Sequence, residues 1–174
     1  MAKTISFSLS SRSIGNAVKE LEAYNRSIDE KVKHLRDIIA ERLRDYAEQG
    51  FLSSPPATRL DGIEVPPPDV KVTTELNGNI TAVIASGEDV YWIEFGAGVY
   101  YNTPVGSSPH PMGQELGLTI GSYGKGRGSR KTWGYYEDGK LVLTHGTPAN
   151  MPMWKATERV AQEYPQIAKE VFGT

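Results

Sequence analysis

The sequence predicts an α+β fold, an antiparallel β-sheet built from hairpins with a long N-terminal helix and a C-terminal helix packed on it. Helical periodicity lies near the two ends of the chain. Between them, the turn dipeptides Asn77-Gly78 and Asp138-Gly139 each separate two strand-like segments. Strands joined by hairpins do not give the alternating βαβ order of a parallel sheet. The length of 174 residues suits a single domain, 1–174.

The N-terminal part of the chain is expected to hold a strand and two helices. Residues 4–10 alternate between apolar and polar side chains, which predicts a strand with one buried face. A short helix is expected at about 13–24, with Ile14, Val18, Leu21 and Tyr24 on one side. A longer helix begins at Ser27, which lies three residues before Glu30 in the spacing of a capping box. Neither helix carries a heptad run long enough to predict a coiled coil.

An apolar stripe runs along the longer helix and predicts its buried side. It consists of Ile28, Val32, Leu35, Ile39, Leu43 and Tyr46. Gly50 can adopt the left-handed conformation that ends a helix, and Phe51 can fold back on it. The helix is therefore expected to end at Gly50.

The first hairpin is expected around Asn77-Gly78, a dipeptide that favours a two-residue type I′ turn. With these residues at the turn, Val72 lies opposite Val83. In the same register, Thr74 lies opposite Thr81. The second strand is apolar on both faces, so we expect it to lie in the interior of a sheet.

The second hairpin is expected around Asp138-Gly139, again with a type I′ turn, and Glu137 then faces Lys140 across the strands. The C-terminal helix is expected over about 151–172, with Asn150 as its N-cap. Its buried side consists of Trp154, Val160, Tyr164, Ile167 and Val171. Pro165 is expected to kink or break this helix.

Two long loops are predicted at about 52–68 and 99–131, because proline, glycine and serine are concentrated there. Residues 90–98 fit either a strand or a short helix. The N-terminus shows no signal peptide, and no stretch approaches the length of a membrane span.

Composition excludes several classes of function. The net charge of −2 argues against electrostatic nucleic-acid binding by the molecule as a whole. The absence of cysteine excludes disulfides, zinc–thiolate sites, iron–sulfur clusters and thiol nucleophiles. No serine lies in a GxSxG elbow, so no catalytic residue and no cofactor is predicted.

A metal hydrolase is the alternative that the histidines leave open. His110 and His145 lie in predicted loops and could bind a metal together with Glu94. No HExxH or HxH spacing places two ligands on one element, so the sequence predicts no metal site.

The glycine-rich segment 121–131 carries four basic residues, Lys125, Arg127, Arg130 and Lys131. It lacks the spacing of a phosphate-binding Walker loop. Two interpretations remain open for it: a solvated flexible loop, or an arm that contacts phosphate or a neighbouring subunit. The second interpretation makes a nucleic-acid-binding module the alternative function.

Two short motifs carry a resemblance to a known family. The first is Tyr-x-x-Glu-Phe-Gly, formed by Tyr91, Glu94, Phe95 and Gly96. The second is Gly-x-Pro-Ala-x-x-Pro, formed by Gly146, Pro148, Ala149 and Pro152 at the start of the final helix. With the predicted order of elements over roughly 5–172, the chain resembles the neck, head–tail joining or tail-completion proteins of long-tailed bacteriophages.

The resemblance implies a non-enzymatic subunit of the head–tail connector. Such a subunit forms a homo-oligomeric ring, a hexamer or dodecamer, that contacts connector and tail proteins and lines the DNA passage. Its location would be the head–tail junction of the virion, and the host cytoplasm during assembly. It would need no membrane, cofactor, metal or small-molecule substrate. In such a ring we expect loops 52–68 and 99–131 to form interfaces, and the four basic residues of 121–131 to face DNA.

Overall fold

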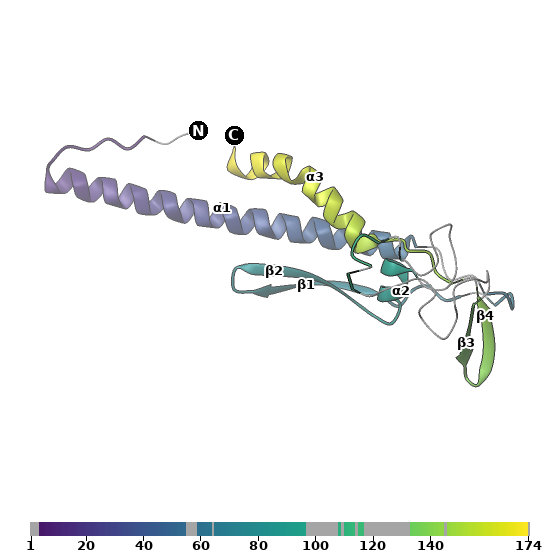
Figure 1. Ribbon diagram of the computed structural model, residues 1–174. Helices are drawn as coiled ribbons and strands as arrows, with labels where there is room; N and C mark the ends of the chain where they lie inside the picture. The colour runs from purple at the N-terminus through teal and green to yellow at the C-terminus, as the bar shows by residue number, and fades with distance from the viewer. Residues whose placement is uncertain are drawn as a thin grey trace.

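The α+β fold class is confirmed in a computed structural model (Figure 1). The structure describes residues 4–54, 59–63, 65–96, 108, 110–113, 115–116, 133–144 and 146–173. Its elements are α1 (Ser11–Leu52), β1 (Lys71–Asn77), β2 (Ile80–Ser86), α2 (Val90–Phe95), β3 (Trp133–Glu137), β4 (Lys140–Thr144) and α3 (Pro152–Phe172). Across the described residues the hairpins form two separate two-stranded antiparallel sheets.

The N-terminal part of the chain is one continuous helix, α1, of 42 residues. Ser10 caps it, since its side chain accepts a hydrogen bond from the Ser13 amide at 3.3 Å. The predicted helix start at Ser27 is wrong because this residue lies inside α1. A serine costs only a few tenths of a kcal/mol within a helix, so a capping-box spacing does not force a break. The predicted end at Gly50 is also wrong, since α1 continues to Leu52.

The predicted strand at 4–10 is absent: residues 4–8 have no regular structure. Alternation alone cannot make a strand, because the backbone groups of a strand need a partner to pair with. The expected buried face is missing too, with Phe7 60% and Leu9 94% exposed.

Helix α3 packs antiparallel against the C-terminal half of α1. Gly50, near the end of α1, meets the first residue of α3, and a Cβ added to Gly50 would lie only 2.7 Å from the Pro152 Cβ. At the other end, the Lys31 ammonium donates to the Phe172 carbonyl at 3.4 Å. Pro165 lies inside α3 without breaking it, although Figure 1 shows the helix changing direction along its length.

A polar cluster joins the two helices beside this contact. The Glu163 carboxylate of α3 accepts hydrogen bonds from Arg42 at 2.8 Å and from the Tyr46 hydroxyl at 2.9 Å. Arg159 also donates to Glu163, and its guanidinium lies 3.8 Å from the centre of the Tyr46 ring. These hydrogen bonds, chiefly the one from Arg42, lower the pKa of Glu163.

The small core lies where α1, α3, the first hairpin and the short helix α2 meet. Its buried cluster consists of Ala47, Phe51, Val72, Ile93 and Ala156. Because these residues come from α1, β1, α2 and α3, the cluster fixes α2 against the start of α3. This arrangement positions the candidate site.

The first hairpin forms as predicted, but its register differs. Val72 pairs with Ala85 and Thr74 with Val83, so the predicted pairings are wrong. The turn consists of Gly78-Asn79, with a positive φ of 61° at Gly78, because glycine takes the first turn position at little cost. The predicted interior position of β2 is wrong as well, since β2 pairs only with β1 among the described strands.

The second hairpin is confirmed in turn and register. Asp138 and Gly139 both have positive φ, 49° and 75°, as a type I′ turn requires. Glu137 pairs with Lys140. Arg59, in the segment between α1 and β1, forms an ion pair with Glu137 of this hairpin at 2.8 Å.

Candidate functional site

The two sequence motifs meet at the N-terminus of α3, and Glu94 joins them. Glu94 lies near the end of α2 and is only 5% exposed. One carboxylate oxygen, Oε2, accepts the Met153 amide at 2.9 Å, and the other, Oε1, accepts the Trp154 amide at 3.0 Å. These are amides of the first turn of α3, which have no partner within a helix. The buried carboxylate therefore caps α3 from a different part of the chain.

Glu94 replaces the cap that the sequence predicts. Asn150 is not the N-cap; that position is Met151, whose backbone is left-handed with φ 53° and whose side chain makes no capping hydrogen bond. The Asn150 amide instead donates to the Ile93 carbonyl at 2.8 Å. This bond fastens the lead-in of α3 directly to α2.

His110 completes the site from the chain segment between the hairpins. Its Nε2 lies 3.1 Å from Glu94 Oε1, and its Nδ1 accepts the Met112 amide at 3.0 Å. Because Nδ1 accepts a hydrogen bond, the proton lies on Nε2 and points to the carboxylate. The histidine ring packs between Phe95 and Trp154, with ring centres 4.4 and 5.6 Å away.

Gly96 allows the two motifs to touch through their backbones. It has φ +81°, and a Cβ there would lie 3.0 Å from the Ala149 nitrogen and 3.3 Å from the Thr147 oxygen. A side chain at this position would therefore need both a strained backbone and a wider gap. The carbonyl of Phe95, the residue before Gly96, accepts a hydrogen bond from the Ser108 hydroxyl at 2.6 Å. This bond adds a contact from the segment that also holds His110.

The chemistry of this junction is that of a structural clasp. Glu94 accepts three hydrogen bonds, and His110 uses both ring nitrogens within the protein. Both side chains are nearly buried. Glu94 and His110 converge and bond to each other and to the backbone, and this pair alone does not make a set of three metal ligands.

The third residue of the metal hypothesis, His145, lies outside the described residues. Within the part that is described, no cluster of three histidine or acidic side chains could hold a metal ion. The four basic residues of the glycine-rich segment, Lys125, Arg127, Arg130 and Lys131, also lie outside the described residues.

The remaining motif residues occupy different environments. Tyr91 is 62% exposed and stacks on Phe95 with ring centres 6.2 Å apart. Gly146 is buried with φ 88° and donates to the Thr144 hydroxyl. Pro148 and Ala149 are half-buried, whereas Pro152 is buried against Gly50. The motifs therefore form one junction, with Tyr91 at its surface.

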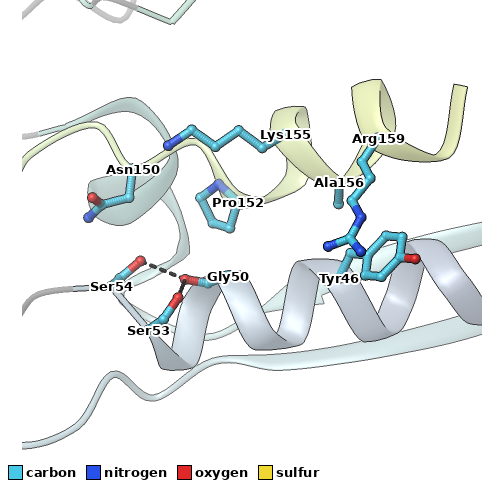
Figure 2. Close-up of a pocket in the computed structure, with 9 residues that line it drawn as sticks. All are labelled: Tyr46, Gly50, Ser53, Ser54, Asn150, Pro152, Lys155, Ala156 and Arg159. Atoms are coloured by element: carbon cyan, nitrogen blue, oxygen red, sulfur yellow. Dashed lines mark hydrogen bonds between the residues drawn. The ribbon is translucent and has the colours of Figure 1, made fainter. Parts of the chain in front are cut away.

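A pocket of about 320 Å³ lies beside the junction (Figure 2). It is lined by Tyr46, Gly50, Ser53, Ser54, Asn150, Pro152, Lys155, Ala156 and Arg159. The Ser53 and Ser54 hydroxyls both donate hydrogen bonds to the Gly50 carbonyl. Among the described residues, the Asn150 side-chain nitrogen is buried without a hydrogen-bond partner. Lys155 and Arg159 also line the pocket, and the Arg159 guanidinium is already paired with Glu163.

Sequence reasoning found the motif residues but not their contacts. Glu94 and Met153 are 59 positions apart, and no local pattern predicts that pair. The sequence suggests His110 only as a possible metal ligand, whereas in the structure its Nε2 bonds to the Glu94 carboxylate. The available signal is that one motif holds an acidic residue and the other opens a helix, whose first-turn amides need acceptors.

Comparison with protein-family models, curated proteins and solved structures gives no match for this chain. In the described residues, no helix combines the length and apolarity needed to cross a membrane.

Proposed function

We propose that this chain is a structural, non-enzymatic subunit of the head–tail connector of a tailed bacteriophage, in the neck or tail-completion ring. In this role it joins head to tail as a hexameric or dodecameric ring and lines the DNA passage. The two motifs that resemble this family support the proposal, because they form one buried junction that fixes α2 to α3.

The observation that carries the proposal is the exposure of large apolar side chains among the described residues. Leu9 is 94% exposed, Leu52 70% and Leu76 63%. Side chains of this kind that stay uncovered in a single chain can be buried against neighbouring subunits. A chain that exposes them on several elements is suited to binding several neighbours.

Large apolar side chains are exposed on the elements that project from the core. Ile80, at the tip of the first hairpin, is 72% exposed, and Tyr136, on the second hairpin, is 76% exposed. Figure 1 shows both hairpins and the N-terminal half of α1 extending away from the meeting point of the helices. Ring subunits contact neighbours on more than one side, which fits this arrangement.

Deletion of the gene from a phage that carries it tests the proposal. We expect separate DNA-filled heads and tails in electron micrographs, and joined particles when purified protein is added back. Labelled protein should then lie at the junction of head and tail. Normal particles without the protein, or purified virions that lack it, would refute the proposal.

A further inference from the structure

The helix α1 carries a heptad pattern over its N-terminal part. The two separate helices expected from the sequence would interrupt this pattern, but α1 is continuous. Apolar positions recur at alternating spacings of four and three along one face. In heptad notation the d positions are Ile14, Leu21, Ile28 and Leu35, and the a positions are Val18, Asn25, Val32 and Ile39. Because α1 runs unbroken from Ser11 to Leu52, these residues form one seam.

Helix α3 covers only the C-terminal end of this seam. Leu35 is 9% exposed beneath it, and Phe172, the last residue of α3, reaches back to Lys31. Toward the N-terminus α3 leaves the seam uncovered, with Val18 47%, Leu21 50% and Val32 51% exposed. Residues 4–10 fold back along the start of α1 (Figure 1), and the seam residues stay about half exposed beside them. Figure 1 shows the N-terminal part of α1 extending past the end of α3. At 1.5 Å per residue, residues 11–31 span about 30 Å.

We propose that two copies of this chain pair through residues 14–32 of α1 as a parallel two-stranded coiled coil. The open seam is self-complementary, with valine at two a positions and isoleucine or leucine at d. Valine at a favours two strands, whereas isoleucine at d, as at Ile14 and Ile28, favours larger bundles. The single asparagine at a decides for the two-stranded state, because it specifies register and oligomer state. In a parallel pair Asn25 meets Asn25 of the second copy, so that the two amides bond to each other.

Charge favours the parallel orientation over the antiparallel one. The e positions that flank the open seam include Glu22 and Asp29. In an antiparallel pair, e positions face e positions, and these acidic side chains would repel one another. In a parallel pair, e faces g, so Asp29 lies opposite the hydroxyl of Tyr24. An antiparallel pair would also place Asn25 against an apolar d residue and leave its amide unpaired.

Sedimentation of the full-length chain tests the pairing. At about 100 µM, where mass action favours association, the wild type should sediment as a dimer. Leu21→Asp should weaken dimerisation by about tenfold or more, because each copy loses a buried leucine. Ala23→Asp, at the outward f position, is the matched control and should leave the dimer intact. Both residues are exposed in the single chain, so neither change should disturb its fold.

Cysteine cross-linking tests the orientation, since the chain contains no cysteine. Asn25→Cys should form a covalent dimer under mild oxidation, because only a parallel pair brings residue 25 of both copies together. Ala23→Cys should cross-link far less. A dimer in which Asn25→Cys does not cross-link would overturn the parallel arrangement. A monomer at high concentration, or a larger oligomer through the same seam, would overturn the two-stranded pairing.

The pairing does not depend on the proposed function. Isolated chain can dimerise even if it never enters a phage particle, and a connector subunit can lack this dimer contact. The sedimentation and cross-linking results therefore fail or succeed separately from the particle experiment.

Discussion

Replacing Glu94 by glutamine removes the charge from the junction while keeping its shape. The glutamine carbonyl can still accept the Trp154 amide and the His110 Nε2 proton. Its NH2 group, however, faces the Met153 amide, which Oε2 accepts at 2.9 Å in the wild type. A buried donor left unpaired costs about 1–3 kcal/mol, and a lost carboxylate at a helix N-terminus costs about 0.3–1 kcal/mol more. We therefore expect Glu94→Gln to lower the free energy of unfolding by about 1–4 kcal/mol.

Equilibrium unfolding in urea, followed by far-UV circular dichroism and by tryptophan fluorescence, measures this change. Asp89→Asn is the matched control, because the Asp89 carboxylate also accepts one amide, that of Asp69 at 3.1 Å, but at an exposed site. Its effect should stay below about 0.5 kcal/mol. Equal stabilities of Glu94→Gln and Asp89→Asn would refute the role of Glu94 as the cap of α3.

Four further predictions concern two glycine contacts, the polar cluster of Glu163 and the glycine-rich segment of the sequence. Gly50→Ala should destabilise the protein by about 1–3 kcal/mol because its Cβ would collide with Pro152, whereas Gly15→Ala, in open space, should raise the helix content seen by circular dichroism. Gly96→Ala should cost about 1–3 kcal/mol in urea unfolding, because it strains the backbone at positive φ; an unchanged midpoint would contradict the close approach of the motifs. Since the pKa of Glu163 is lowered from its usual value of 4.5, its stabilising effect is complete above that pH and is lost as the pH falls through the lower folded value. The melting temperature of the wild type should therefore fall more steeply in acid than that of Glu163→Gln, and parallel curves would count against the cluster. Finally, alanine at Lys125, Arg127, Arg130 and Lys131 should weaken DNA binding by the isolated chain and flatten its salt dependence; a wild type that binds no DNA at low salt would remove these residues as DNA contacts.

Local signals predicted the second hairpin and the C-terminal helix correctly. The Asp138-Gly139 turn needs positive φ at both residues, and that requirement alone gave the second hairpin and its register. The C-terminal helix was predicted at 151–172 and lies at Pro152–Phe172. In both cases the decisive interactions lie within a few residues of one another.

Signals failed where distant contacts or weak local preferences decide the structure. The spacing of Ser27 and Glu30 suggested a helix start, but the same residues fit a helix interior at small cost. In the first hairpin, a shift of the turn by one position preserved which residues share a face, so the apolar pattern could not distinguish the registers. At the site, the motif residues were found, whereas the Glu94 cap needs a contact between α2 and α3 that only the folded core provides.

The junction and the open surfaces should respond differently to mutation. Glu94 and Gly96 act inside the fold, so changes there should reduce assembly only as far as they reduce stability. Leu21 lies on the seam that α3 leaves uncovered, at 50% exposure, so a change there should reduce self-association while the free energy of unfolding of the single chain stays nearly constant. Since buried and exposed sites separate in this way, a plot of association against stability for a set of variants would show two groups. One group alone would mean that assembly depends on the fold as a whole, with no dedicated contact surface.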